Sequence, residues 1–434
     1  MRVLAIDVGT SSSKAAVLDV ERAVPVGQIA RVGYELDHPT PEAAEISVER
    51  LWTSIASAAR AAARPIEGVE AVGFSCLTPA LVLLDGADRP LGPIWTHLDR
   101  RSRAAARQVW ADVGEEFLAT TGNRPLPGGI SAISWRQQVD LDPYLSRKTR
   151  CYLHVNGWLS LHTTGEKVFD PANASFTGIY GTLTDQSWSG RWCSYFGVEP
   201  EWLPRVVSGS TTIGTLRPGI AAELGVPAGV PVKLGTADTS SAVLAAGMVP
   251  GDLLHMVGTT QVVAALAPRP QPSPLRLTRL LGVGKEYIHV AHNPVGGGAL
   301  EWMHGLCFQD QGAAKFYNET VKLALEHPTR VTLDPPYLGG DRLEIEAHRA
   351  AFRDLTLSTD RLELLAAVLQ AMKRRHYEAL NSLGLGSHFD RVFLAGGGAD
   401  VVRQLIPEYA HGQTYPLEEG SLRGVACLFR QSIP

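Results

Sequence analysis

The sequence lacks the features that mark secreted, membrane-spanning or zinc-binding proteins. Its 434 residues include five cysteines, which are scattered and form no CxxC pair, so neither a disulfide framework nor a zinc site is indicated. The longest apolar runs fall far short of the roughly 20 residues of a membrane helix. The N-terminus has one arginine and a short apolar run before Asp7, which does not fit a signal peptide. We therefore expect reduced thiols and a cytoplasmic location.

An excess of charge of one sign is also absent. Lys and Arg number 40 and Asp and Glu 44, which gives a net charge of −4 without a long basic run. Neither nucleic acid nor an anionic membrane is therefore expected as a partner. The hydrophobic content of 45 % can fill a large core, and the length exceeds that of one typical domain. Two or three domains are predicted.

The most informative stretch is the first nineteen residues, MRVLAIDVGTSSSKAAVLD. Two short apolar runs flank a small polar turn, which predicts a strand, a tight turn and a strand. Asp7 ends the first run, and Gly9, Thr10 and Ser11 lie in the turn. Such a carboxylate can hold Mg²⁺ through water, while turn N–H groups and hydroxyls donate to phosphate oxygens. An ordinary hairpin with a solvated turn explains the same stretch equally well.

The next part of the chain alternates strands with a helix before it becomes less regular. β formers at 26–36 indicate a third strand, and the apolar stripe over 47–64 predicts a helix that begins at a serine N-cap. Further strands are predicted at 69–75 and 81–84, which makes an α/β order. The region 86–202 is where an insertion with substrate contacts is expected.

A second strand–turn–strand pattern opens the other half of the chain. It is predicted over 253–266, where Val257-Gly258-Thr259 repeats the Val8-Gly9-Thr10 of the first hairpin. Two such hairpins at corresponding places indicate an internally duplicated fold. Just before the second hairpin, a strand at 230–238 ends in a carboxylate, and a helix of small residues at 239–247 follows.

Glycines mark another candidate site toward the C-terminus. A strand at 392–395 runs into Gly396-Gly397-Gly398, and a helix is predicted over 400–409. A strand, a glycine turn and a helix N-terminus suit a nucleotide ribose or phosphate, although the stretch does not match GxGxxG. A glycine turn needed only for tight packing is the alternative. A long amphipathic helix is predicted over 360–383.

The order of these motifs resembles the FGGY carbohydrate kinases, which are members of the actin/hexokinase/Hsp70 ATPase superfamily. The resemblance covers nearly the whole chain. Residues 7–14 look like the family's first phosphate motif, residues 91–102 look like its Trp-x-Asp-x-Arg region, and residues 164–175 look like its TGE…D-x-x-NAS stretch. Residues 235–238 look like the segment with the catalytic aspartate, and residues 250–260 look like the second phosphate motif. Residues 336–342 look like the family's P-Y-L-x-G-E-R segment, and residues 396–404 look like its adenosine motif.

The resemblance implies an α/β fold of two actin-like (ribonuclease H-like) domains with an inter-domain cleft. Residues 1–247 would form the N-terminal domain, with the substrate region and the first phosphate motif, and residues 248–434 the C-terminal domain. It also implies ATP and Mg²⁺ as cofactors, with Asp7 positioning the metal. The residues expected along the nucleotide are Gly9, Thr10 and Ser11 on one side of the phosphates, Gly258, Thr259 and Thr260 on the other, and Gly396, Gly397 and Gly398 along adenosine.

The activity that the resemblance implies is ATP-dependent phosphorylation of a hydroxyl of a sugar, polyol or sugar acid, with a ketose such as a pentulose favoured. Asp238 is assigned as the base that accepts the hydroxyl proton; a helix N-cap is its alternative role. Thr78 and Trp95 are candidate sugar contacts, and a buried structural tryptophan is the alternative for the second. Residues 75–80 match neither the pentulose-kinase nor the glycerol-kinase pattern, so the polyol contacts must differ.

The rival interpretation is a non-catalytic ATP-binding sugar sensor or scaffold of the same superfamily. The presence of both Asp7 and Asp238 argues against it, because a protein that only binds needs no base. The partner expected is a small-molecule sugar or polyol, and a homodimer is left open.

Overall fold

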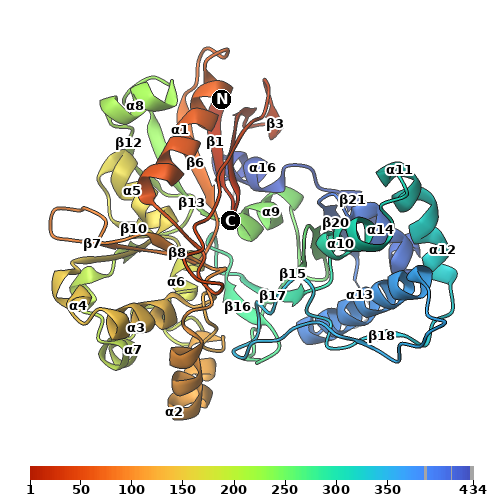
Figure 1. Cartoon of the computed structure of the whole chain (residues 1–434). Coiled ribbons are helices and arrows are strands. Elements are labelled where there is room, and N and C mark those ends of the chain that lie inside the picture. Colours follow the sequence, from red (N-terminus) through yellow and green to blue (C-terminus); the bar gives the residue numbers. More distant parts are fainter. Residues whose placement is uncertain (386–388, 412, 431–434) are drawn as a thin grey trace.

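The computed structural model describes residues 1–385, 389–411 and 413–430. Two large sheets, one in each half of the chain, dominate the architecture (Figure 1). The first sheet has the order β12-β13-β6-β1-β2-β3, with β4 also paired to β2. Its strands are β1 (Arg2–Val8), β2 (Ser12–Asp19), β3 (Val24–Pro25), β4 (Ala30–Gly33), β6 (Ala71–Cys76), β12 (Thr212–Thr215) and β13 (Pro231–Ala237).

The second sheet has the order β16-β17-β15-β14-β20-β21. Its strands are β14 (Leu253–Val257), β15 (Gln261–Leu266), β16 (Leu277–Leu280), β17 (Tyr287–Asn293), β20 (Arg391–Ala395) and β21 (Gln413–Pro416). Both predicted hairpins, β1–β2 and β14–β15, are therefore confirmed.

The two sheets share one pattern of strand directions. In the first, β4, β2 and β1 are antiparallel neighbours, and β6 and β13 continue parallel to β1. In the second, β17, β15 and β14 are antiparallel neighbours, and β20 and β21 continue parallel to β14. This repeat confirms the predicted pair of ribonuclease H-like units and the internal duplication.

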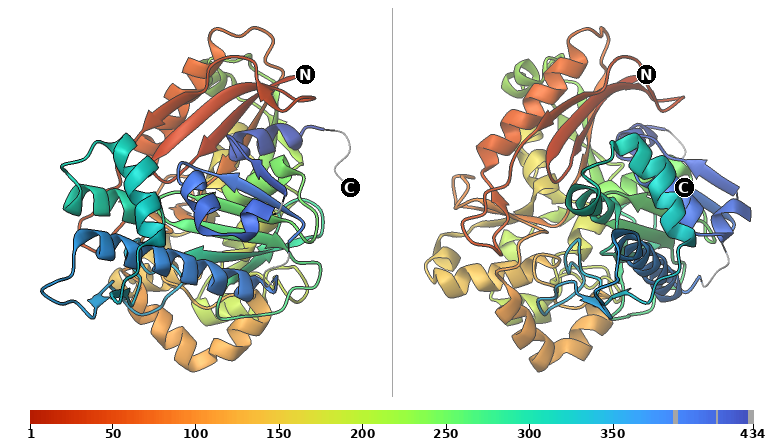
Figure 2. Two further views of the ribbon diagram at one scale, coloured as in Figure 1. Left: turned by 90° about the vertical axis from the view of Figure 1, so that its right-hand side faces the viewer. Right: turned by 45° about the vertical axis from the view of Figure 1, so that its right-hand side comes forward.

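Helices cover the sheets where the sequence places an apolar stripe. In α1 (Val48–Ala63), Ser47 is the N-cap and accepts a hydrogen bond from the Arg50 N–H, as predicted. In α13 (Arg361–Leu383), Asp360 and Glu363 form a capping box. The first helix packs in the core of the first sheet and the second helix in that of the second sheet (Figure 2).

The remaining elements connect and flank these layers. The other helices are α2 (Arg103–Thr121), α3 (Ser131–Leu141), α4 (Leu145–Lys148), α5 (Val155–Thr164), α6 (Pro171–Ser175), α7 (Gly190–Phe196), α8 (Pro218–Leu224), α9 (Asp238–Ala246), α10 (Gly297–Cys307), α11 (Ala313–Lys315), α12 (Val321–Glu326), α14 (Ala399–Leu405), α15 (Glu408–His411) and α16 (Gly420–Cys427), with short helical turns at Pro200–Trp202 and Phe316–Thr320. The other strands are β5 (Glu45–Ile46), β7 (Ala80–Leu84), β8 (Ile94–Thr96), β9 (Cys151–His154), β10 (Val168–Phe169), β11 (Arg205–Val206), β18 (Thr332–Leu333) and β19 (Phe352–Arg353).

Two predicted elements are wrong in extent. The single helix expected over 400–409 is interrupted between α14 and α15 at Ile406 and Pro407, because proline lacks the N–H that a continuing helix requires. The third strand expected over 26–36 is reduced to the four residues of β4. Among the described helices, none is both long and apolar enough to cross a membrane.

Helix α16 lies far from the first sheet in sequence but packs on it. Leu422 and Val425 of this helix share a core with Val3 and Ala71 of the first sheet. A Cβ on Gly424 would overlap the backbone of Ser241 in α9, so glycine permits the close crossing of these two helices. The division of the chain at residue 247 stays a prediction.

Candidate active site

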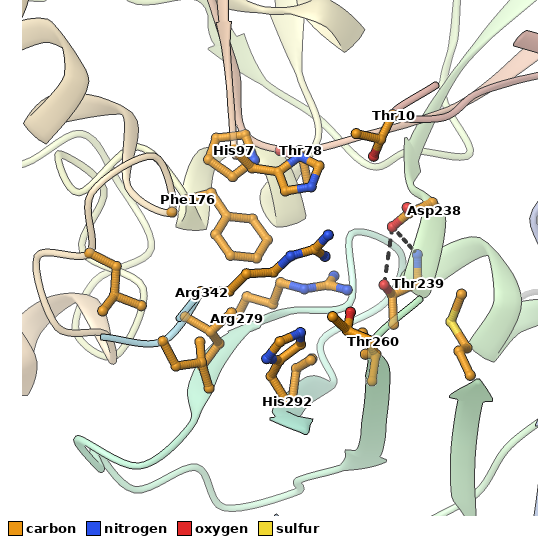
Figure 3. A pocket seen from close by; sticks show the side chains of 18 of the residues that line it. Thr10, Thr78, His97, Phe176, Asp238, Thr239, Thr260, Arg279, His292 and Arg342 are labelled. Atoms are coloured by element: carbon orange, nitrogen blue, oxygen red, sulfur yellow. Dashed lines mark hydrogen bonds between the residues drawn. The ribbon is translucent and has the colours of Figure 1, made fainter. Parts of the chain in front are cut away.

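The turns of the two hairpins meet at one cavity of about 380 Å³ (Figure 3). Thr10 reaches it from the β1–β2 turn, and Gly258, Thr259 and Thr260 reach it from the β14–β15 turn. Asp238 lines the same cavity from the start of α9. The structure therefore brings together residues that are more than 200 positions apart in the sequence, and it does so in the arrangement that a duplicated fold predicts.

Asp238 keeps part of its carboxylate free. Its Oδ1 accepts hydrogen bonds from the Thr239 N–H at 2.5 Å and from the Thr239 hydroxyl at 3.0 Å. Within the described residues, Oδ2 accepts none. The N-cap of α9 is Ala237 rather than Asp238, so the alternative role as a capping residue is wrong. A carboxylate oxygen without an internal donor remains available to a ligand in the cavity.

Gly235 explains how the chain brings Asp238 to this position. Its φ of +80° lies in the left-handed region, and a Cβ there would overlap the carbonyl oxygen of Phe74 in β6. The pairing of β13 with β6 is irregular between Lys233 and Thr236. Glycine thus allows β13 to lie close to its neighbour while the strand end changes direction toward the cavity.

Asp7, near the end of β1, is not among the residues that line the cavity and is only 8 % exposed. The Ser75 hydroxyl donates to its Oδ1 at 3.0 Å. Burial and then the charge of Asp238 raise the pKa of Asp7 to about 7. Lys14 is already paired with Glu419, at 2.8 Å. Two neighbouring carboxylates whose nearby lysine is engaged elsewhere fit a site for a divalent cation.

The described residues contain no cluster of three or more His, Cys, Asp or Glu side chains able to hold a metal by themselves. A Mg²⁺ ion does not require such a cluster, because proteins hold it by one or two carboxylates, substrate phosphates and retained waters.

The other predicted nucleotide residues lie outside the lining of the cavity. Gly9 and Ser11 belong to the same turn as Thr10, and the Gly9 N–H donates to the Ser12 carbonyl at 3.0 Å. Gly396 has a φ of +93°, and a Cβ on it would overlap the Val257 carbonyl oxygen of β14. Tight packing therefore accounts for this glycine.

Gly397 differs from its two neighbours. A Cβ on Gly398 would press on the Val257 side chain, whereas a Cβ on Gly397 would meet open space. The contact of these three glycines with adenosine stays a prediction, and Gly397 is the one of the three at which an added Cβ has open space.

Only one of the two candidate sugar contacts, Thr78 and Trp95, lines the cavity. Thr78 lines the cavity, and its hydroxyl donates to Asn173 Oδ1 at 2.8 Å. Trp95, which is 6 % exposed, does not line it. The Arg101 guanidinium lies 3.6 Å from the Trp95 ring centroid, which is a stacking contact within the protein. The position of Trp95 therefore favours the alternative, a buried tryptophan with a structural role.

Sequence analysis missed the basic side chains of the cavity. These are His97, Arg100, Arg279, His292 and Arg342. Burial lowers the pKa of Arg100 and of Arg279 to about 10, so both stay charged at neutral pH. Burial, together with the nearby Arg342 and Arg100, holds the pKa of His97 and of His292 well below the ordinary value, so both imidazoles are neutral.

Two repeated ribonuclease H-like sheets with a cavity at their hairpin turns define the class as the actin-like fold. Solved structures agree: the xylulose kinase from Lactobacillus acidophilus has a TM-score of 0.88 at 19 % identity, over 98 % of this chain and 88 % of that one. Residues 2–245 match the family model described as the FGGY family of carbohydrate kinases, N-terminal domain. The chain belongs to the FGGY family of carbohydrate kinases.

Curated relatives extend this comparison. A gluconokinase from Bacillus subtilis (strain 168) is 24 % identical over 94 % of this chain and 82 % of its own length. A putative sugar kinase, YoaC, of the same organism is 26 % identical over 61 % of this chain. The chain spans about half (53 %) of the length of that second relative.

Proposed function

We propose that this protein catalyses ATP-dependent phosphorylation of a hydroxyl group on a sugar, polyol or sugar acid. The observation that carries the proposal is the convergence of Thr10, Asp238 and the Gly258–Thr260 turn on one cavity. The family membership supports it, as do relatives that are named as gluconokinase and xylulose kinase.

Phosphoryl transfer needs alignment, neutralisation of charge and a base for the hydroxyl proton, and little covalent help from the protein. Asp238 would accept the proton of the attacking hydroxyl, through the carboxylate oxygen that has no donor within the described residues. Thr10, Thr259 and Thr260 would donate to phosphate oxygens from the two turns. Because the turns belong to different halves of the chain, closure of the halves would complete the site and exclude water.

Asp7 would hold Mg²⁺ through water. The metal would neutralise negative charge on the phosphates during transfer. Metal binding would also favour the ionised form of Asp7, which burial and the charge of Asp238 disfavour in the protein alone.

The alternative is a non-catalytic ATP-binding sugar sensor or scaffold. A sensor would need the turns but not a base with a free oxygen in the cavity, so the position of Asp238 favours the kinase. The cytoplasmic location stays a prediction, consistent with the five free cysteines. The homodimer stays an untested alternative.

The test is release of ADP from MgATP with a panel of ketoses, polyols and sugar acids, using the wild type and Asp238→Asn. We expect turnover with at least one acceptor and its loss in the variant, while ATP still binds. If ATP binds and no acceptor increases turnover, the sensor is the better interpretation. If Asp238→Asn retains full turnover, Asp238 is not the base.

A further inference from the structure

The cavity contains more positive charge than its lining carboxylate balances. Its charged lining residues are Asp238, Arg100, Arg279 and Arg342. Arg100 is engaged within the protein: it donates to the carbonyls of His97 at 2.9 Å and Pro127 at 2.6 Å, and its Nε lies 3.6 Å from Asp341. Two arginines therefore remain against one carboxylate. Asp170, which is buried outside the lining, is a second carboxylate whose charge acts on Arg279.

Arg279 comes from β16 and is only 2 % exposed. Its Nη1 donates to the Ser240 hydroxyl, and its guanidinium carbon lies 5.4 Å from the centroid of the Phe176 ring. Its Nε is buried and has no hydrogen-bond partner in the described residues. A buried donor on a charged group is costly when it is left unpaired. An acceptor from outside the protein would remove that cost.

The second arginine, Arg342, has no partner of its own within the described part of the protein. It forms no hydrogen bond and no ion pair with the described residues, although burial lowers its pKa and the charge of Asp238 counteracts this. Figure 3 shows the side chains of Arg279 and Arg342 side by side, both pointing into the cavity toward Asp238 and Thr239.

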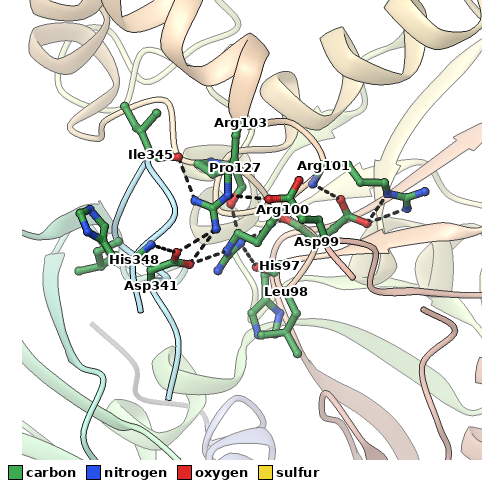
Figure 4. Close-up of polar contacts among 12 residues, drawn as sticks. His97, Leu98, Asp99, Arg100, Arg101, Arg103, Pro127, Asp341, Ile345 and His348 are labelled. Atoms are coloured by element: carbon green, nitrogen blue, oxygen red, sulfur yellow. Dashed lines mark hydrogen bonds and ion pairs between the residues drawn. The ribbon is translucent and has the colours of Figure 1, made fainter. Parts of the chain in front are cut away.

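The loop that carries Arg342 is held in place by its neighbour, Asp341. We call residues 336–348 the strap. Arg103 donates from Nη2 to both oxygens of Asp341, at 3.0 and 2.9 Å, and from Nη1 to the Ile345 carbonyl at 2.9 Å (Figure 4). The His348 N–H also donates to Asp341, at 2.9 Å. Arg342 is thus positioned before a ligand arrives, which reduces the ordering cost of binding.

Neutral hydrogen-bonding groups surround the two arginines. His97 Nδ1 and His292 Nε2 are buried without a partner in the described residues. Thr78 adds a hydroxyl to the same lining. A ligand that satisfies these groups therefore needs planar acceptor oxygens, as in a carboxylate, for the arginines, and hydroxyl groups for the imidazoles.

We infer that the phosphate acceptor is a sugar acid, a polyhydroxy carboxylate whose carboxylate is bound by Arg279 and Arg342. This inference rests on the proposed function and narrows its acceptor class. A carboxylate offers planar acceptor oxygens to Arg342 and to the Nε of Arg279, which have no hydrogen-bond partner among the described residues, whereas a neutral ketose or polyol offers only uncharged oxygens.

The experiment uses acceptors of matched length: D-gluconate, D-glucitol, D-fructose and D-glucose 6-phosphate, and the five-carbon set D-xylonate, xylitol and D-xylulose. We expect kcat/KM for the better aldonate to exceed that for its alditol by about a hundredfold, since a charge-assisted interaction contributes on the order of 3 kcal/mol. Arg342→Gln should remove most of this preference, because it should raise KM for the aldonate much more than KM for the alditol. The matched control is Arg349→Gln, since Arg349 follows the strap but is exposed and is absent from the cavity lining.

Failures of the two proposals are distinguishable. If a ketose, an alditol or the sugar phosphate is used as well as the aldonates or better, the acid inference is overturned and the kinase stands. If no acceptor supports ADP release, the kinase proposal fails, and calorimetry with D-gluconate and D-glucitol still tests the arginines. Equal affinity for both ligands, or gluconate binding that Arg342→Gln does not weaken, overturns the inference.

Discussion

The Asp7 carboxylate should lower the free energy of unfolding when no metal is bound, and Asp7→Asn should therefore increase the stability of the protein. The ordinary pKa of the carboxyl is 3.8, whereas burial and the charge of Asp238 raise the pKa to about 7 in the fold. Between these two pH values the folded state binds the proton more tightly than the unfolded state does. The contribution of Asp7 to stability consequently falls as pH rises from 3.8 to 7 and then levels off.

The size of the effect follows from the same two pKa values. Their difference corresponds to about 4 kcal/mol of lost stability at pH 8, which asparagine, having no charge, avoids. At pH 5 the gain should fall to less than half of that value. Asparagine also retains an oxygen that can accept the hydrogen bond that Ser75 donates in the wild type.

The assay is urea unfolding of both proteins at pH 5 and pH 8, without Mg²⁺ or nucleotide. MgATP should then stabilise the wild type more than the variant, because the variant lacks the carboxylate that would hold Mg²⁺. The control is Asp140→Asn, at an exposed carboxylate beside Arg136 on α3, which should be nearly neutral at both pH values. A variant that is less stable at pH 8, or a stability difference that does not change with pH, would refute the reasoning.

Three further predictions follow from the packing. Gly235→Ala should lower the free energy of unfolding by at least about 3 kcal/mol in urea, because its Cβ would overlap the backbone of Phe74. Gly219→Ala, where a Cβ meets open space, should cost almost nothing, and equal effects of the two variants would contradict this reasoning. The contribution of His154 and of His255 to stability should decrease as pH falls from 6.5 to 4, because burial lowers the pKa of both to about 4, which corresponds to up to about 3 kcal/mol for each histidine. His255→Gln should remove one of these contributions from the pH dependence of the urea midpoint, and an unchanged slope would count against the assignment. Asp341→Ala should lower the free energy of unfolding by about 3 kcal/mol, since it removes the carboxylate whose two oxygens both accept from Arg103. Glu346→Ala removes an exposed ion pair with Arg107 at 3.1 Å and should cost under about 1 kcal/mol. Similar urea midpoints for both variants would show that the strap is not anchored at Asp341.

Local sequence patterns were sufficient for most of the fold. The two hairpins, the capped α1 and the capped α13 follow from residue periodicity and from end signals, which act over a few positions. The predicted helix over 400–409 failed at Pro407, although the rule that proline interrupts a helix is itself local. The pairing of the two hairpins across the cavity could be inferred only because the chain repeats itself.

The candidate site was only partly predictable for a different reason. Thr10 and Thr259 lie in motifs that carry their own signal, and Arg342 lies in a segment that the family resemblance had already marked. Arg279 is one residue in an ordinary strand, and only the tertiary structure shows that it faces the cavity rather than solvent. Trp95 illustrates the converse, because its place in a suggestive segment did not bring it to the cavity.

The packing of α16 on the first sheet has a consequence for the order in which the protein folds during synthesis. The core that Val3 and Ala71 share with Leu422 and Val425 cannot form until nearly the whole chain has left the ribosome. Until then one face of the first sheet is apolar and uncovered, as in other long-range topologies that fold slowly. A nascent chain halted after α9 should therefore bind chaperones or aggregate, and extension through α16 should release it.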